Sequence, residues 1–596
     1  MAIISNEEIA RAVEGDTLAT AFLRTLRTYP NRVALRQRAE DGSYDEWTFA
    51  EYAQHVSGAA AHLRSLGVGP GDRVVLMMRN CVDFHLIDLA VVFCGATAIS
   101  IYNSSSPEQV AYLAGHCKAK VAVVEDDGFL ERFGKVRDQL PDLEHIINLA
   151  DDGVPDALFH GGTFDLEAGA ADVTPDTLAT VIYTSGTTGP PKGVMLSHYN
   201  VMWTCESLRR SFGDDIDLTG FRLVSYLPMA HIAERATSHY QQIINAFEVT
   251  SCPDFGLIAS YLKDVRPNIM FGVPRVWEKL HAGLTAALAS DPARKAQFDA
   301  AVEMAKPISI DRAWERSTPE QDATWQALQD AAFGPMRAAI GLEEIRFAIS
   351  GAAPIARELL EWYNAIGVPL SEIYGMSESS GPMTWAPVHI KPGTVGPAIP
   401  GCEVKLAADG EVICKGGNVF IGYLDDPEKT AESLDDDGWL HSGDIGEVDD
   451  DGYFRIVDRK KELIITAGGK NVSPANLEAV MKSVELVGQA IAIGDNKPFI
   501  AALVVLDPEV APAWAKREGI EFTSLADLAD NPAVVAEVER EVKEAMKQFN
   551  SAEQVKKVKV LGEEWLPDSE ELTPTSKLKR RGVHAKYASE IDALYS

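Results

Sequence analysis

The sequence predicts an α/β fold built on mainly parallel sheets. Short apolar runs end in polar or turn residues, as buried strands do, at 72–78, 120–126, 179–185 and 221–228. Helical patterns lie between these runs, and such alternation is typical of parallel sheets that are covered by helices. With 596 residues, of which 46% are hydrophobic, the chain is long enough to form more than one core.

We expect two domains, a large N-terminal one over residues 1–457 and a small α+β one over residues 458–596. Within the first, residues 281–340 are rich in Ala, Gln and Asp, which predicts a helical insertion. Residues 400–456 alternate polar and apolar side chains between frequent Gly and Asp turns. That pattern predicts a small β-rich subdomain.

The net charge restricts the partners of the protein. The formal charge is −33, from 88 acidic and 55 basic side chains, which argues against nucleic acid as a partner. An anionic substrate would therefore need a local group of hydrogen-bond donors and cations. The simpler explanation of the acidity is a solubility trait of the source organism, and that alternative stays open.

The cysteines and the N-terminus bear on the compartment. The seven cysteines are scattered without a CxxC spacing, which is typical of a reduced protein, so we expect a cytoplasmic location. The first residues are acidic where a signal peptide is basic. The most apolar segment, 89–102, is too short to cross a bilayer. Peripheral membrane contact and a homodimer stay open.

One loop carries the chemistry of a phosphate site. Residues 181–198 read VIYTSGTTGPPKGVMLSH, in which glycines allow close approach, hydroxyls donate and Lys192 adds a charge. Backbone amides in such a turn form an anion-binding concavity. The hydroxyl residue that should follow the lysine in the common phosphate loop is replaced by Gly193, and the G-x-G-x-x-G fingerprint is absent. A Gly- and Thr-rich surface turn is the alternative.

The stretch YTSGTTGPPKG resembles the phosphate loop of the AMP-forming adenylating superfamily, which comprises acyl-CoA synthetases, peptide-synthetase adenylation domains and luciferases. Further stretches resemble the other motifs of this superfamily, in the same order, over roughly residues 30 to 585. They are SGAAP (350–354), YGMSESSG (374–381), HSGD (441–444), DRKKELIITAGGKNVSP (458–474) and TPTSKLKRR (573–581).

The resemblance implies a nucleotide site for ATP. The residues expected at the phosphates are Thr184, Ser185, Gly186, Thr187, Thr188, Gly189 and Lys192. Those expected along or near the adenine are Gly351, Ala352, Ala353, Tyr374, Gly375 and Ser377, the last standing where Thr is commoner. The ribose hydroxyls are assigned to Asp444 and Arg459. Taken alone, Asp444 could equally be a helix N-cap.

The resemblance also implies the metal ligands and the catalytic residues. Glu378, with the hydroxyl of Thr184, is expected to hold Mg²⁺, and Lys577 is expected to be the catalytic lysine. His231 is placed beside the acyl pocket as a further catalytic candidate. The alternatives are a solvated turn carboxylate at Glu378, a solvated basic face around Lys577 and a satisfied core histidine at His231.

A rotation of the C-terminal domain about Lys461 is implied between two reaction steps. The second orientation would present Gly468, Gly469 and Lys470 to the pantetheine arm of coenzyme A, although these residues could be only a turn at a strand end.

The implied activity is that of an ATP-dependent fatty acyl-CoA ligase, which forms an acyl-adenylate and pyrophosphate, then acyl-CoA and AMP. FGVPRVWEKLH (271–281), residues 227–235 and the helical insertion resemble long-chain and bubblegum-type enzymes. Amino-acid-activating members carry an aspartate within 227–235, where this chain has Glu234 and Arg235, and we expect no carrier domain. The alternatives are a fatty acyl-AMP ligase that loads a carrier protein, a medium-chain or aryl acid CoA ligase, and a non-catalytic nucleotide sensor.

Overall fold

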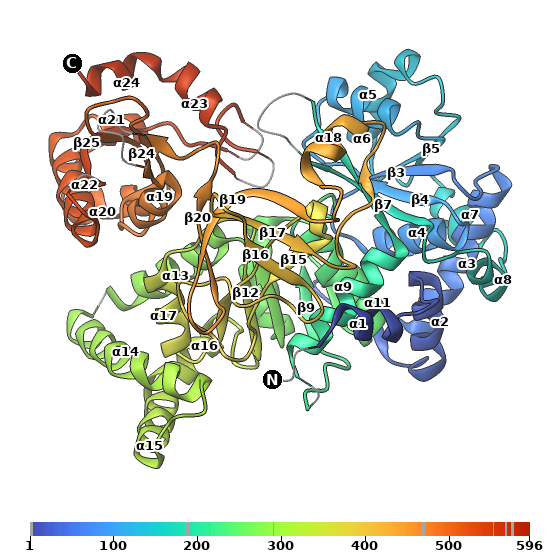
Figure 1. The fold of residues 1–596 in the computed structure, drawn as a ribbon, viewed down its shortest axis with the longest axis horizontal. Helices are drawn as coiled ribbons and strands as arrows, with labels where there is room; N and C mark the ends of the chain where they lie inside the picture. The colour runs from blue at the N-terminus through green and yellow to red at the C-terminus, as the bar shows by residue number, and fades with distance from the viewer. Residues whose placement is uncertain are drawn as a thin grey trace.

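The computed structural model has the predicted α/β architecture, with a large N-terminal part and a small C-terminal domain (Figure 1). It describes residues 4–184, 190–213, 215–289, 291–465, 471–551, 553–566, 569–573 and 577–596. Among these residues, no helix has the length and apolarity needed to cross a bilayer. All seven cysteines are free thiols, and six of them are buried.

The first layer is a seven-stranded sheet in the order β18-β8-β7-β4-β3-β5-β6. Its five middle and outer strands from β7 to β6 run parallel, whereas β8 pairs antiparallel with β7 and with β18. The strands are β3 (Arg73–Met77), β4 (Thr97–Ser100), β5 (Val121–Val124), β6 (His145–Asn148), β7 (Leu178–Thr184), β8 (Lys192–Ser197) and β18 (Gly422–Tyr423).

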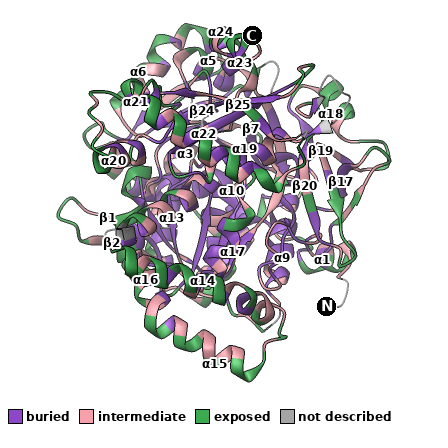
Figure 2. Ribbon diagram, turned by 90° about the vertical axis from the view of Figure 1, so that its left-hand side faces the viewer, coloured by how far each residue is buried: buried purple, intermediate pink, exposed green. Residues whose placement is uncertain are grey.

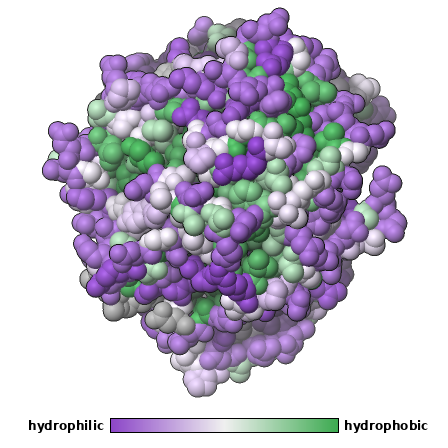
Figure 3. All heavy atoms as spheres, turned by 90° about the vertical axis from the view of Figure 1, so that its right-hand side faces the viewer, coloured by the Kyte–Doolittle hydropathy of each residue, from purple (hydrophilic) through white to green (hydrophobic). Residues whose placement is uncertain are grey.

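Helix α4 (Val82–Phe93) connects β3 to β4 and is buried at nearly every position. Buried residues gather inside the molecule, whereas α15 (Pro319–Leu328) at its edge is intermediate or exposed (Figure 2). A helix that is buried on nearly every side belongs to a core, and the apolar segment 89–102 is the end of α4 followed by β4. Helix α3 (Phe49–Ser65) packs against α4. The face on the right-hand side of Figure 1 is mostly hydrophilic, with apolar side chains gathered in small areas (Figure 3).

Two smaller sheets complete the α/β part. One has the order β2-β1-β10-β9, and the other consists of the parallel strands β11, β12 and β13. Between β11 and β12 the chain forms α13 to α16, of which α14 and α15 project from the body (Figure 1). The elements are β1 (Val33–Arg38), β2 (Tyr44–Thr48), β9 (Arg222–Ser225), β10 (Glu248–Ser251), β11 (Ile269–Gly272), β12 (Phe347–Ser350), β13 (Leu370–Glu372), α13 (Pro274–Ala289), α14 (Pro292–Ala313), α15 (Pro319–Leu328) and α16 (Gly334–Ala339).

An antiparallel sheet precedes the C-terminal part, which has a three-stranded sheet of its own in the order β23-β24-β25. The antiparallel strands are β16 (Glu403–Leu406), β17 (Glu411–Lys415), β19 (Leu440–Val448) and β20 (Phe454–Arg459). The C-terminal elements are β23 (Val487–Ile493), β24 (Ile500–Leu506), β25 (Val555–Leu561), α19 (Pro474–Lys482), α20 (Val510–Arg517), α21 (Leu525–Ala529), α22 (Pro532–Ala545), α23 (Arg580–Lys586) and α24 (Ala588–Leu594).

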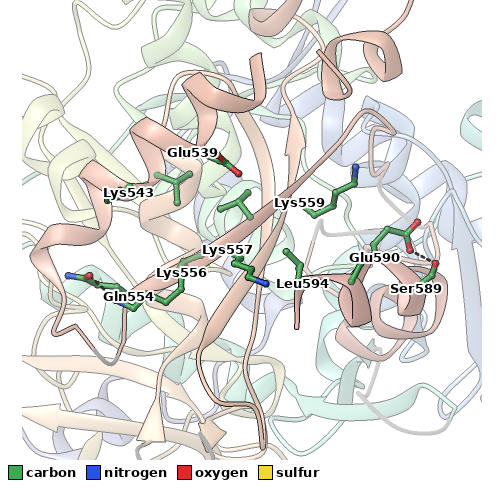
Figure 4. Close-up of a pocket in the computed structure, with 13 residues that line it drawn as sticks. Glu539, Lys543, Gln554, Lys556, Lys557, Lys559, Ser589, Glu590 and Leu594 are labelled. Carbon is green, nitrogen blue, oxygen red and sulfur yellow. Dashed lines mark hydrogen bonds between the residues drawn. The ribbon is translucent and has the colours of Figure 1, made fainter. Parts of the chain in front are cut away.

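A groove of about 760 Å³ lies on the C-terminal domain between β25, α22 and α24 (Figure 4). Four lysines line it, namely Lys543, Lys556, Lys557 and Lys559. Lysines along the edge strand of a sheet discourage pairing with another chain. The lining includes none of the residues that the sequence assigns to the nucleotide or the acyl group, so the candidate active site lies elsewhere.

A buried charge network joins α4 to the π-helical turn η2 (Arg235–Tyr240). The carboxylate of Asp88 accepts from Arg235 and, at 2.9 Å, from Nε2 of His239, whose Nδ1 lies 3.0 Å from Nδ1 of His85. Burial alone would raise the pKa of Asp88, but Arg235 and His239 hold it at about 2. This network fixes the segment that follows His231, and it explains Arg235 as a core residue.

We expect Asp88→Asn to lower the free energy of unfolding by about 3–5 kcal/mol, because the guanidinium of Arg235 would stay buried without its counter-charge. Urea unfolding followed by tryptophan fluorescence measures the shift of the first transition. Glu537→Gln is the control: it breaks an exposed ion pair with Arg540 and should cost less than about 0.5 kcal/mol. Equal midpoints for the two variants would contradict this account of the network.

Candidate active site

The candidate site forms at the carboxyl ends of β11, β12 and β13, where ligands bind in open α/β sheets. Gly272, Ser350 and Glu372 end these strands and pair in register. The SGAAP stretch begins at the last residue of β12, and the YGMSESSG stretch follows β13. The backbone N–H of Ile373 donates to Ser350 O at 2.9 Å, so the two adenine-side motifs lie side by side.

Two glycines of these motifs are required by close packing. A Cβ on Gly351 would lie 2.8 Å from Cγ2 of Ile373, and one on Gly375 would lie 1.9 Å from the carbonyl oxygen of Gly381. Gly375 belongs to β14 (Tyr374–Met376), which pairs with β15 (Gly381–Thr384). Ala352 adopts a positive φ of 68°. Close packing and backbone conformation therefore explain the small residues at 351, 352 and 375 without reference to a ligand.

Asp444 is held between two side chains that the sequence assigns to the same nucleotide. It lies within β19 directly opposite Arg459 of β20, so the alternative of a helix N-cap is wrong. Tyr374 Oη donates to Oδ2 of Asp444 at 2.6 Å, and Nε of Arg459 lies 3.3 Å from Oδ1. Burial raises the pKa of Asp444 despite the opposing effects of Arg459 and Tyr374. The carboxylate is thus oriented before any ligand binds.

Glu378 is also buried, with only 6% of its surface exposed, so a solvated turn carboxylate is wrong. It sits in the short 3₁₀ turn η5 (Ser377–Ser379), beside the buried Ser377. Its Oε1 accepts from Tyr423 Oη at 2.7 Å, and Nζ of Lys192 lies 4.2 Å from the centre of the Tyr423 ring. Tyr423 therefore connects the lysine of the phosphate loop to the carboxylate expected at the metal.

The phosphate loop is placed at its two ends. Thr184, the last residue of β7, pairs in register with Lys192, the first residue of β8. The predicted phosphate contacts between them lie outside the described residues, namely Ser185, Gly186, Thr187, Thr188 and Gly189.

Lys577 reaches this site from the C-terminal domain. Its backbone N–H donates to Thr573 Oγ1 at 3.0 Å, and its carbonyl accepts from the N–H of Thr573 at 2.8 Å. Burial and then the charge of Arg459 lower the pKa of Lys577, while Asp444 and Glu378 raise it. Its ammonium group therefore lies within electrostatic range of three side chains from the other motifs.

The other cations of the C-terminal motif have different partners. Nζ of Lys579 donates to Ser569 O at 2.8 Å, and Arg580 pairs with Glu478 at 2.6 Å and with Glu462 at 3.1 Å. The motif is therefore divided between contacts within the C-terminal domain and the lysine that faces the site. A uniformly solvated basic face does not describe it.

His231 is half-buried at the start of the short helix α10 (Ile232–Glu234). Its Nδ1 accepts from the N–H of Ala233 at 3.1 Å, so the ring proton is on Nε2. Burial and the nearby charge of Lys577 lower the pKa of His231 to about 3. The imidazole is thus a neutral hydrogen-bond donor near Lys577. The alternative of a satisfied core histidine accounts for the hydrogen bond to Nδ1 but assigns no partner to Nε2.

Three further predicted residues and one hinge residue complete the set. Gly468, Gly469 and Lys470 lie outside the described residues. Lys461 is exposed in the turn that follows β20.

The sequence missed two residues of the site. Tyr423 holds Glu378, and Glu372 ends β13 beside the adenine-side motifs, where burial raises its pKa to about 8. Neither stands in a stretch that the motifs singled out. The signal for Tyr423 is the antiparallel pairing of β18 with β8, which only the folded chain shows.

The fold and the site define an α/β protein in which a second domain delivers a lysine to a site lined by buried carboxylates. The chain belongs to the AMP-binding enzyme family: the model of that family matches residues 22–424, and the model of its C-terminal domain, "AMP-binding enzyme C-terminal domain", matches residues 461–596. The family predicted from the motifs is confirmed.

Relatives agree with this assignment, and a solved structure shows the same fold. The chain is 35% identical, over 98% of both chains, to the long-chain-fatty-acid–CoA ligase FadD15 of Mycobacterium tuberculosis. It is 32% identical to the long-chain-fatty-acid–CoA ligase ACSBG2 of Xenopus laevis, over 97% of this chain and 84% of that one. The fold is similar to that of the adenylation domain of a carboxylic acid reductase from Segniliparus rugosus in complex with AMP, with a TM-score of 0.74, 21% identity, and 99% and 96% of the two chains covered.

We expect His231 to stay uncharged between pH 5 and 8. An unfolded chain binds a proton at histidine near pH 6.5, whereas folded His231 does so only near pH 3, so acidification through this window costs stability. NMR of protein with isotope-labelled histidine, assigned with His231→Gln, should show no shift of this imidazole in that range. The same signal in urea-unfolded protein should titrate near 6.5. A midpoint near 6.5 in the folded protein would contradict the neutral donor.

Proposed function

We propose that this chain is an ATP-dependent long-chain fatty acyl-CoA ligase. The observation that carries the proposal is the arrangement of the motif residues. Tyr374 and Arg459 hold Asp444, and Tyr423 holds Glu378. The charges of Asp444, Arg459 and Glu378 act on Lys577 of the C-terminal domain. Relatives that match nearly the whole chain and are named long-chain-fatty-acid–CoA ligases support the substrate class.

In the first step, an oxygen of the fatty acid carboxylate forms a bond to the α-phosphorus of ATP, and pyrophosphate leaves with the electron pair of the broken P–O bond. Both reactants are anionic, so the site must position them and neutralise the developing charge. Lys577 supplies the positive charge between carboxylate and α-phosphate, and His231 Nε2 donates a neutral hydrogen bond beside it.

The nucleotide is held by fixed groups around this centre. Asp444, oriented by Tyr374 and Arg459, accepts from the two ribose hydroxyls, and Gly351 to Ala353 pass along the base. Lys192 with the loop from Thr184 to Gly189 holds the β- and γ-phosphates. Because Asp444 is held in place in the free protein, little side-chain ordering has to accompany binding.

Glu378 and Thr184 fit a Mg²⁺ site that the nucleotide completes. Among the described residues, no group of three His, Cys, Asp or Glu side chains could hold a metal ion. Mg²⁺ is commonly bound by one or two carboxylates together with phosphate oxygens and water. Glu378 is buried and accepts from Tyr423, whose ring lies under Lys192 of the phosphate loop, which suits a carboxylate that meets a phosphate-bound cation. When bound, the ion would neutralise charge on the phosphates.

In the second step, the sulfur of coenzyme A bonds to the acyl carbon, the acyl–oxygen bond to AMP breaks, and the thiol proton is released. We propose that residues 458–596 rotate about Lys461 between the steps, which withdraws Lys577 and brings Gly468, Gly469 and Lys470 to the pantetheine arm. The division near residue 457 is supported by the cores: one pair of apolar clusters ends by Leu440, and the other begins at Ile464.

We expect purified protein with ATP, Mg²⁺ and palmitate to release pyrophosphate, and added coenzyme A to accelerate AMP release and yield palmitoyl-CoA. A series of acids from octanoate to palmitate, with benzoate as the aryl control, should favour the longest chains. AMP release that coenzyme A leaves unchanged would contradict the CoA ligase and favour a ligase that loads a carrier protein. A preference for octanoate or benzoate would contradict the long-chain substrate.

A further inference from the structure

Helix α13 presents three charged side chains on one face at its first turns. Arg275, Glu278 and Lys279 are spaced i, i+3 and i+4, which places them together on a helix surface. Between them, Trp277 is fully buried, and its Nε1 lies 3.3 Å from Gly272 O and Ile349 O. The helix is therefore anchored to the ends of β11 and β12, and its charged face is held rigidly.

The C-terminal domain places a charged side chain opposite each of these three, and each has the opposite sign to its partner. Nη2 of Arg275 lies 2.7 Å from Oδ2 of Asp507, and Nζ of Lys279 lies 3.0 Å from Oε1 of Glu509. The third pair, Lys482 with Glu278, is at 3.9 Å. Figure 1 shows α13 directly below the domain that carries α19 and α20. We call these six residues the α13 ion-pair cluster.

Asp507 is the fixed member of the cluster on the C-terminal side. It follows β24, and its Oδ1 accepts from the backbone N–H of Glu509 at 2.9 Å and of Val510 at 3.0 Å. Oδ2 is then free to point at Arg275, and the side chain is 10% exposed. A charge-assisted hydrogen bond between two groups that are both held in place is stronger than an exposed, flexible ion pair.

The cluster and Lys577 belong to the same domain orientation. Arg275 lies three residues after Gly272 at the rim of the candidate site, and Asp507 lies on the domain that carries Lys577. Arg275 and Glu278 also pair with each other within α13, at 3.8 Å. The other three pairs cross between the two bodies, so a rotation of the C-terminal domain must break all three. Contacts present in only one of two states bias the equilibrium toward that state.

We propose that the α13 ion-pair cluster, through Arg275 and Asp507, positions the C-terminal domain for the adenylate-forming step and is not used in the thioester-forming step. This inference rests on the proposed function. It makes Arg275 and Asp507 positioning residues, which act on the reaction through the placement of Lys577.

The two half-reactions separate this role from a general loss of stability. We expect Asp507→Asn, which keeps the backbone acceptor Oδ1, and Arg275→Gln each to lower palmitate-dependent pyrophosphate release by about tenfold, the change that accompanies loss of a charge-assisted hydrogen bond. Thioester formation from supplied palmitoyl-AMP and coenzyme A should stay equal or become faster. An equal fall of both half-reactions, or no fall of the first, would overturn the proposal.

The coupling between the two residues is tested by a double-mutant cycle. The double variant Asp507→Asn with Arg275→Gln should be no slower than either single one, because both remove the same pair. Additive losses would contradict a direct pairing. Arg540→Gln, which breaks an ion pair within α22, is the matched control and should leave both half-reactions unchanged.

A measurement without substrate keeps the inference independent of the activity. Spin labels at Ala323→Cys on α15 and Ala593→Cys on α24, both exposed, report the distance between the two bodies in a Cys81→Ser background. The chain with the intact cluster should give one narrow distance distribution, and Asp507→Asn a broader one or a second maximum. Identical distributions would overturn the proposal, whereas absence of any acid-dependent pyrophosphate release with intact orientation would count only against the proposed function.

Discussion

The site depends on one buried carboxylate. Asp444 has 7% of its surface exposed, and it is held by Tyr374 from one motif and by Arg459 from another, while Lys577 approaches from the C-terminal domain. A buried carboxylate without such partners would bind a proton or be excluded from the core. The paired strands β19 and β20, the stretch that carries Tyr374 and the C-terminal domain must therefore come together for Asp444 to be stable as an anion.

The surroundings of Lys577 follow from the same constraint. Burial and the charge of Arg459 disfavour the charged form of the Lys577 amine and lower its pKa, whereas Asp444 and Glu378 favour the charged form. The negative charge of a bound triphosphate would favour it further. The neutral His231 adds a donor without adding a second repulsive charge. The site is complete only while the C-terminal domain stays in place. The ion pairs between α13 and that domain matter because they join the domain that carries Lys577 to the rim of the site.

Much of this was predictable from the sequence, and the remainder has a physical reason. Buried parallel strands have a local signature, so β3, β5, β7 and β9 were found, and the motif residues Asp444, Arg459 and Glu378 do come together. Tyr423 was missed because its contact with Glu378 depends on the pairing of β18 with β8. Arg275 and Asp507 were missed because no local pattern reports a contact between two domains.

The central claim is that Lys577 supplies the charge for the first step, and the rate of palmitate-dependent pyrophosphate release by Lys577→Ala tests it most directly. Lys579→Ala is the matched control, since that amine is bound to Ser569 O. We expect Lys577→Ala to lose about 100- to 1000-fold in this rate with ATP binding nearly unchanged, and Lys579→Ala to keep it. Full pyrophosphate release by Lys577→Ala would contradict the account.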